Sequence, residues 1–506
     1  MANDYLERIL RARVYDVASE TPLERAERLS KRYKADIWLK REDMQSVFSF
    51  KLRGAYNNIY NLSPEARERG VIAASAGNHA QGVALAGKRL GVAALIVMPT
   101  TTPPIKVQTV RSLGARIVLH GDSYDDAYEH ALELSREKQL TFVHPFDDPD
   151  VIAGQGTIAM EVLRQHEDPI DAIYIPVGGG GLIAGMAAYI KRVRPEIRVI
   201  SVEPEETPTL QKALAAGRRV TLKQIGLFAD GVAVKQIGRE TFKLARRYVD
   251  DTVLVSTDEI CAAIKDIYDD TRSVAEPAGA LAVAGIKKHA QGGSLEGQSL
   301  VAVLSGANIN FDRLRHVAER AELGEQREAL FAVEIPERPG SFLAFCRVLG
   351  KRNITEFNYR YADPKRAHVF CGVELSGGNE EKESLKQKLQ QKGFPVVDLT
   401  DNETAKLHIR YMVGGHAPQV HNEQLFRFVF PERPGALLNF LSGLSRGWNI
   451  SLFHYRNHGS AYGRVLVGIQ LEHGELGEFR AYLKELGYRY HEETDNPAYR
   501  LFAGAG

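Results

Sequence analysis

The strongest constraint on the fold is an alternation of short apolar runs with helical stretches from about residue 35 to residue 325. Gly91 follows the helical stretch 79–90 and Gly114 follows 104–113, as expected at helix C-termini. Near-continuous apolar strands joined by helices predict an α/β fold with a doubly wound, largely parallel sheet. Ligands of such sheets bind beyond the carboxyl ends of the strands. The expected strands lie at 37–39, 71–74, 94–97, 116–119, 172–175, 199–202, 253–255 and 300–304.

The remainder of the chain carries a repeat. The segment 331–340 recurs as 426–435, an offset of 95 residues, and the similarity slips by one residue at Asn353 and Asn449. Each copy predicts a strand, a Pro-Gly turn, a helix and a second strand, which is an α+β unit of about 80–90 residues. Because the repeat contains no catalytic constellation, it predicts a binding or assembly module. The apolar residues of the two expected helices are Phe342, Leu343, Phe345, Val348 and Leu349, then Leu437, Leu438, Phe440, Leu441 and Leu444.

At 506 residues the chain is too long for a single core. The change from alternating elements to a repeat places the main boundary near residue 325. We therefore expect three domains, at 1–325, 326–405 and 420–506, with a linker within 400–425.

Composition excludes several classes of function. Lys and Arg number 65 against 64 Asp and Glu, so no charge excess predicts a nucleic-acid or anionic-membrane partner. No apolar run approaches membrane-spanning length, and the N-terminal residues lack the apolar core of a signal peptide. The three cysteines have no metal or redox spacing and are typical of buried residues in a reducing compartment. These features predict a soluble, cytoplasmic protein.

Lys51 lies in an apolar stretch, 46–55, at the start of a helical pattern. We expect Phe48 and Phe50 to desolvate the lysine partly, which disfavours its ammonium form and makes the amine available for Schiff-base chemistry. From this stretch alone, an ordinary surface lysine in the first turn of a helix is the better interpretation. The case for chemistry depends on three distant loops.

The first loop is Gly178-Gly179-Gly180-Gly181-Leu182, which follows an expected strand and opens a helix. Consecutive glycines allow several backbone N–H groups to face one anion, and the helix dipole adds to the attraction. The glycine spacing does not fit a dinucleotide fingerprint, and no P-loop Lys follows. The loop predicts a phosphate site for a small ligand, with a plain tight turn as the alternative.

The second loop is Ser75-Ala76-Gly77-Asn78-His79, again between a strand and a helix. Its N–H groups suit a second anion such as a carboxylate, although an ordinary helix N-cap remains the alternative. The third loop is 304–308, where Ser305 could cap a helix or offer its hydroxyl to a ligand atom.

Together these loops resemble the fold-type-II family of pyridoxal-phosphate enzymes, over about residues 15–320. The resemblance implies two catalytic lobes and the cofactor pyridoxal 5′-phosphate. It further implies that a serine at the ring nitrogen leaves that nitrogen neutral and favours loss of a β-hydroxyl group. The implied roles are Schiff-base lysine and catalytic base for Lys51, cofactor binding for Phe50, Asn78, Gly178, Gly179, Gly180, Gly181, Leu182 and Ser305, and substrate binding for Ser75, Ala76, Gly77, Asn78 and His79.

The duplicated C-terminal unit resembles the paired ACT-like regulatory domains of the threonine dehydratase branch of that family. This implies a homotetrameric lyase that converts L-threonine, and also L-serine, to a keto acid and ammonia, the first step of isoleucine biosynthesis. Isoleucine would inhibit the enzyme through the C-terminal domain, and valine would relieve the inhibition. The alternative is a related β-elimination or β-replacement enzyme acting mainly on serine.

Two departures from relatives limit the resemblance. Racemases of the family have a second serine where this chain has Ala76, so two-base racemisation is not expected. A divalent-cation site in some relatives needs an acidic residue six positions after a Glu-Pro pair, but Glu203-Pro204 is followed by Thr209, so we expect no metal. The segments 272–279, with Glu276, and 144–148, with His144, also resemble the family, but their roles stay open.

Overall fold

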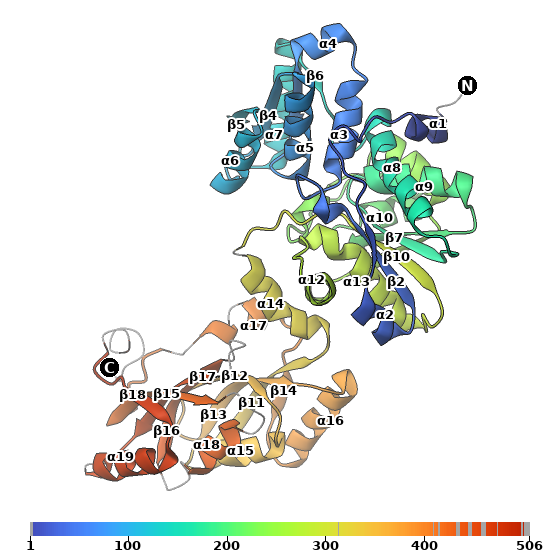
Figure 1. Cartoon of the computed structure of the whole chain (residues 1–506). Helices are drawn as coiled ribbons and strands as arrows, with labels where there is room; N and C mark the ends of the chain where they lie inside the picture. Colours follow the sequence, from blue (N-terminus) through green and yellow to red (C-terminus); the bar gives the residue numbers. More distant parts are fainter. Residues whose placement is uncertain are drawn as a thin grey trace. The chain divides into compact units, whose positions relative to one another are not determined.

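The computed structural model describes residues 4–311, 313–407, 409–412, 415–431, 436–443, 448–456, 462–472, 474–496 and 499. The chain divides into two compact units, Met1–Gly324 and Glu325–Gly506 (Figure 1). Within the described ranges, no helix combines the length and the apolar character needed to cross a membrane.

The first unit contains two sheets, as the fold-type-II resemblance implies. The larger sheet has the strand order β1-β2-β10-β7-β8-β9, and all neighbours in it are parallel except the antiparallel pair β1 and β2. The smaller sheet is entirely parallel, in the order β5-β4-β3-β6. The strands are β1 (Leu23–Arg25), β2 (Asp36–Arg41), β3 (Val71–Ala74), β4 (Ala94–Met98), β5 (Arg116–Leu119), β6 (Thr141–Phe142), β7 (Ala172–Pro176), β8 (Arg198–Pro204), β9 (Asp251–Val255) and β10 (Ser299–Leu304).

Helices connect these strands, and the 3-10 turn η1 precedes the loop that leads to Lys51. Gly91 ends α5 in the left-handed conformation, at φ 68°, as its position predicted. The elements are α1 (Tyr5–Leu10), α2 (Glu27–Tyr33), η1 (Glu42–Met44), α3 (Lys51–Tyr60), α4 (Pro64–Arg69), α5 (Asn78–Leu90), α6 (Pro104–Ser112), α7 (Tyr124–Glu137), α8 (Pro149–Gln165), α9 (Gly181–Val193), α10 (Thr209–Ala216), η2 (Asp230–Val232), α11 (Arg239–Tyr248), α12 (Thr257–Thr271), α13 (Pro277–Gly292) and α14 (Arg313–Gly324).

A buried ionic cluster holds α3 against β2 and α8. Arg53 donates from Nε to Glu42 at 2.8 Å and from Nη1 to Glu161 at 2.6 Å. Lys40 also donates to Glu161, at 2.6 Å, and all four side chains are fully buried. The two cations balance the two anions, which is the condition under which buried charge is tolerated. The cluster therefore fixes the helix that begins at Lys51.

The second unit is one eight-stranded antiparallel sheet in the order β14-β11-β13-β12-β16-β17-β15-β18. The two repeats meet where β12 pairs with β16, from Glu356 against Arg456 to Arg360 against Leu452. The helices α15, α16, α18 and α19 lie along one face of the sheet (Figure 1). The elements are β11 (Glu328–Pro336), α15 (Ser341–Leu349), β12 (Ile354–Arg360), β13 (Arg366–Glu374), α16 (Gly378–Gln391), β14 (Val396–Asp398), α17 (Glu403–Leu407), η3 (Ile409–Tyr411), β15 (Glu423–Pro431), α18 (Ala436–Gly443), β16 (Asn449–Arg456), β17 (Tyr462–Gln470), α19 (Glu475–Leu486) and β18 (Arg489–Glu492).

Both repeats contribute to one apolar core. Phe345 of the first helix and Phe440 of the second are fully buried in it, together with Phe357 and Phe453 of the two strands that pair at the junction. The second Pro-Gly turn, 432–435, and Leu444 lie outside the described residues. The predicted separation into subdomains at 405 and 420 stays a prediction, since the two repeats share their sheet.

The stretch expected to be a linker, 400–425, contains ordered elements. It holds α17 and η3, and β15 begins within it at Glu423. Arg410 is buried and donates to Glu356 Oε1 from Nη2, at 2.7 Å. This part of the chain is therefore packed against the first repeat.

Candidate functional site

Backbone hydrogen bonds join the loop before Lys51 to the loop after β10. The N–H of Phe50 donates to the Ser305 carbonyl at 3.3 Å, and the N–H of Ala307 donates to the Phe48 carbonyl at 2.9 Å. The N–H of Glu276 donates to the Gly306 carbonyl at 3.1 Å. Three segments far apart in the sequence thus meet at the carboxyl end of β10.

Lys51 lies at the centre of this arrangement. Its Nζ donates to the Pro145 carbonyl at 3.2 Å and lies 5.3 Å from the centroid of the Phe50 ring. Burial lowers the pKa of the Lys51 ammonium to about 8, and the negative charge of Glu276 opposes the shift. The expectation that Phe48 shields the lysine is wrong. Phe48 has a left-handed backbone, at φ 54°, and its side chain is 56% exposed.

The loop 75–79 presents N–H groups at the start of α5. The N–H of Ser75 donates to the Val97 carbonyl at 3.1 Å, and that of Gly77 donates to Ser75 Oγ at 3.2 Å. The N–H groups of Ala76, Asn78 and His79 have no acceptor in the described part of the chain. Three open donors at a helix N-terminus suit a carboxylate.

His79 has a different environment from its neighbours in the loop. The side chain is buried, and its Nε2 lies 2.9 Å from the Val143 carbonyl. Burial, and then the positive charge of Lys51, lower its pKa to about 3. The ring is therefore neutral near pH 7, and because a carbonyl only accepts, Nε2 carries the proton and donates.

The glycine loop connects β7 to α9. Gly180 is the N-cap of α9 in the left-handed conformation, at φ 91°. A Cβ atom on Gly179 would overlap the ring of Phe146, and one on Gly178 would lie 2.8 Å from the Val232 Cα. The N–H groups of the four glycines, 178–181, donate to no described acceptor. The loop is therefore a set of open backbone donors that only glycine can build.

The remaining predicted residues adjoin these loops. Ser305 is buried, and its hydroxyl donates to the Ala278 carbonyl over a long 3.3 Å bond, from which it can rotate toward a ligand atom. The side chains of Phe50 and Leu182 are buried in one apolar cluster. The site therefore offers an amine, two groups of open N–H donors and a hydroxyl. These groups fit a small phosphorylated aldehyde that has a ring nitrogen, and pyridoxal phosphate is such a molecule.

Asn78 is held from both sides by residues whose roles the sequence left open or did not indicate. Its Nδ2 donates to Glu276 Oε1 at 2.6 Å, and its Oδ1 accepts from Asn308 Nδ2 at 2.6 Å. Burial, and then the charge of Asp230, raise the pKa of Glu276 to about 7. The position of Asn308, three residues after Ser305, was the only sequence signal for it.

The segment 143–147 contacts Lys51, His79 and the glycine loop. The His144 Nδ1 accepts from the N–H groups of Phe146 and Asp147, at 3.2 and 2.8 Å, and burial lowers the pKa of the ring. The Asp147 carboxylate accepts three backbone N–H groups at the start of α11, from 239 to 241. His144 thus shapes a turn that places Phe146 against the glycine loop.

Glu203 is bound by protein donors. Its carboxylate accepts from Thr209 Oγ1 at 3.0 Å and from the N–H groups of Leu210 and Gln211 at 2.7 and 2.9 Å. These donors form the first turn of α10, and burial raises the pKa of Glu203 to about 7. Within the described residues, no group of three or more His, Cys, Asp or Glu side chains could hold a metal ion.

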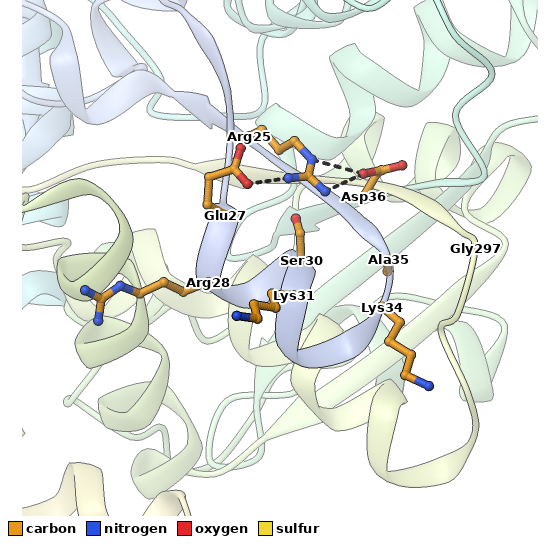
Figure 2. A pocket seen from close by; sticks show the side chains of 9 residues that line it. All are labelled: Arg25, Glu27, Arg28, Ser30, Lys31, Lys34, Ala35, Asp36 and Gly297. Atoms are coloured by element: carbon orange, nitrogen blue, oxygen red, sulfur yellow. Dashed lines mark hydrogen bonds and ion pairs between the residues drawn. The ribbon is translucent and has the colours of Figure 1, made fainter.

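A surface pocket of about 420 Å³ lies elsewhere in the first unit, beside α2 (Figure 2). It contains none of the predicted site residues. One of its cations is neutralised, because Arg25 donates from Nε to Asp36 at 3.0 Å and is also bound to Glu27. The candidate active site is therefore the cluster of loops around Lys51 and not this pocket.

Comparison with known proteins shows the family of the chain. The family described as "Pyridoxal-phosphate dependent enzyme" matches residues 14–306, and "C-terminal regulatory domain of Threonine dehydratase" matches 319–409 and 414–503. The chain is 58% identical over 504 residues to "L-threonine dehydratase biosynthetic IlvA" of Burkholderia multivorans, covering 99% of both chains. It is 56% identical over 499 residues to the protein of that name in Escherichia coli, covering 99% of this chain and 97% of that one.

Solved structures resemble the larger part of the chain. The processed form of threonine deaminase isoform 2 from Solanum lycopersicum is 52% identical, with a TM-score of 0.62, and the match covers 63% of this chain and 92% of that one. Maize serine racemase is 31% identical, with a TM-score of 0.59, and the match covers 62% and 96%.

Proposed function

The chain belongs to the biosynthetic threonine dehydratases, pyridoxal-phosphate enzymes with a C-terminal regulatory domain, and from this premise we propose what it converts and which residues act. It is a lyase that eliminates water from L-threonine and hydrolyses the resulting enamine, so that the net products are 2-oxobutanoate and ammonia, the first step of isoleucine biosynthesis. L-Serine is the second substrate. The observation that carries the assignment of residues is the meeting of Lys51, the two donor loops and Ser305 at one end of β10.

Lys51 has two tasks in this proposal. It tethers the cofactor, and after the substrate amine has displaced it, its Nζ accepts the proton from the substrate Cα. When bound, pyridoxal phosphate supplies the electron sink that makes this proton acidic. The lowered pKa of Lys51 supports both tasks, because a larger share of the amine is neutral near pH 7 than for an exposed lysine.

The loops orient the reacting groups. The N–H groups of Ala76, Asn78 and His79 hold the substrate carboxylate and so determine which Cα bond is broken. The N–H groups of 178–181 hold the cofactor phosphate, with Leu182 continuing the helix behind them. The Ser305 hydroxyl would bind the ring nitrogen of the cofactor, and Phe50 would pack beside the Lys51 side chain. Loss of water leaves an enamine, which hydrolyses to 2-oxobutanoate and ammonia.

The second unit regulates this reaction in our proposal. Isoleucine, the end product, binds to the paired repeats and inhibits, while valine relieves the inhibition. The family match to a regulatory domain supports an effector. An effector acts through different affinities for two states, typically by about 1–3 kcal/mol.

Assembly and location complete the proposal. We expect a homotetramer in the cytoplasm. The three cysteines support a reducing compartment, because each is buried and none forms a disulfide.

The test measures keto-acid formation from L-threonine, with and without isoleucine, by wild type and Lys51→Ala. The variant should lose the visible absorbance of bound cofactor and nearly all turnover. Lys88→Ala, which changes an exposed lysine of α5, is the control and should match wild type. Near-normal turnover by Lys51→Ala would disprove the assignment, and absence of turnover in wild type would disprove the activity.

A further inference from the structure

A directional chain of hydrogen bonds runs through the active site. It begins at the Val47 carbonyl, which accepts from Asn308 Nδ2 at 2.8 Å. The same Nδ2 donates to Asn78 Oδ1 at 2.6 Å, and Asn78 Nδ2 donates to Glu276 Oε1 at 2.6 Å. The chain connects the loop before Lys51 to α5 and to the start of α13.

The direction of this chain is fixed at both ends. A backbone carbonyl can only accept, so the Asn308 nitrogen must face Val47 and Asn78. The Asn78 oxygen therefore faces Asn308, and its nitrogen faces the Glu276 carboxylate. With its amide reversed, Asn78 would set donor against donor and acceptor against acceptor. One N–H of Asn78 is used by Glu276, and the second has no described acceptor.

The site around Glu276 is built to admit a carboxylate. Glu276 is the N-cap residue of α13, yet its side chain accepts no N–H from that helix and turns to Asn78 instead. A Cβ atom on Gly306 would overlap the carboxylate, and one on Gly231 would lie 3.6 Å from its Oε1. The side chain is 4% exposed. Glycine at 306 therefore leaves the space that the acid occupies, whereas a Cβ atom at 231 would be in ordinary contact with it.

We propose that Glu276 is a positioning residue, which fixes the Asn78 amide so that its second N–H donates to the ring oxygen of the cofactor. The inference rests on the proposed function and on the cofactor-binding role that the family resemblance implies for Asn78, a contact with the ring oxygen. A buried acceptor for one N–H holds the other at the trigonal angle of the amide nitrogen, so the donor is oriented before the cofactor arrives. Asn308 completes the restraint from the oxygen side.

The experiment is a double-mutant cycle in the full-length holoenzyme. Glu276→Ala, Asn78→Ala and the double variant are compared by the wavelength of the visible absorption of bound cofactor and by kcat and KM for L-threonine. Glu276→Ala and Asn78→Ala should shift the band in the same direction and lower kcat by about tenfold or more, the size expected for a hydrogen bond to a charged group. The double variant should be no worse than Asn78→Ala.

Two further variants test whether Glu276 acts by positioning the Asn78 amide or through its negative charge, and whether a loss of activity comes from poor folding. Glu276→Gln keeps an oxygen that accepts the N–H, so its band should match wild type and its kcat should recover most of the loss. Asn308→Ala removes the other restraint and should shift the band as Glu276→Ala does, which tests the chain if Glu276→Ala folds poorly. Glu203→Gln is the matched control, because Glu203 is equally buried and does not contact Asn78. It should leave the band unchanged.

The inference is overturned by an unshifted band in both Glu276→Ala and Asn308→Ala, by additive effects in the double variant, or by a Glu276→Gln variant as impaired as Glu276→Ala. Failure of the proposed function is distinct, since it appears in wild type as missing cofactor absorbance or missing keto acid.

Discussion

At the scale of single residues, burial and a nearby negative charge have opposite effects on the pKa of Lys51. Its ammonium pKa lies near 8 instead of its ordinary 10.5, because burial outweighs the attraction of Glu276. The neutral amine is the form that reacts with an aldehyde, so uptake of pyridoxal phosphate by stripped enzyme should accelerate as pH rises, with a midpoint near 8. The rate at which visible absorbance appears, followed from pH 6.5 to 10, measures this.

The Glu276→Gln variant checks the cause of that midpoint. Removing the negative charge also removes the attraction that holds the Lys51 pKa up, so the midpoint should move to lower pH. A midpoint near 10 in the wild type would show that Lys51 is solvated when the cofactor is absent.

Ala76 provides a second prediction at this scale. Its methyl side chain carries no group able to move a proton on the opposite side of the substrate Cα. The wild type should therefore convert L-threonine and L-serine to keto acids without producing D-isomers. Chiral chromatography of the residual amino acid measures this, and D-serine formed at a rate close to that of elimination would contradict the one-base argument.

The residues found from sequence and those missed differ in how far apart their partners lie. Lys51 and the glycines 178–181 sit in short segments that can be recognised locally, although the role of Lys51 could be assigned only together with the three distant loops and the family resemblance. The contact of Asn78 with Glu276 joins residues 198 positions apart, and no local pattern specifies it. The exposure of Phe48 depends on a left-handed backbone that an apolar residue does not signal.

At the scale of elements, the glycine loop makes a steric prediction. A methyl group on Gly179 would overlap the Phe146 ring, so Gly179→Ala should move the loop away from its donor geometry. The dissociation constant for pyridoxal phosphate, from equilibrium dialysis, should rise about tenfold or more, the loss expected when a charge-assisted hydrogen bond is misplaced. Gly292→Ala is the matched control, because nothing lies within 4 Å of its added Cβ. Equal affinities in the two variants would rule out close packing as the reason for glycine.

The eight expected strands all occur. Most are buried parallel strands and therefore nearly uniformly apolar, whereas β5 is exposed at both ends and was found from its short apolar run. Each repeat contains elements that the sequence did not predict, among them β13, β14 and α16 in the first copy. The helix α16 buries only three of its fourteen residues, so its sequence carries little apolar periodicity. The antiparallel edge strand β1 has three residues, too few for a pattern.

At the scale of the whole molecule, the first unit has its own sheets and cores and ends with α14 at Gly324. A chain truncated after Gly324 should therefore keep threonine dehydration, with kcat within about threefold of the full chain, a change of less than 1 kcal/mol. It should lose inhibition by isoleucine and relief by valine. Initial rates against isoleucine for both forms decide this. Inhibition of the truncated enzyme at the same concentrations would place the effector site within 1–324.

The order of the strands in the second unit determines how the pairing of its two repeats depends on the concentration of the protein. Read outward from the β12–β16 junction, each half of the sheet repeats the other, so the unit corresponds to a homodimer whose two subunits are joined by residues 399–422. Free subunits of such a dimer would separate on dilution. Because the two halves belong to one chain and share one core, their pairing does not depend on the concentration of the enzyme. The junction between the repeats therefore persists even when the cell makes few copies of the chain.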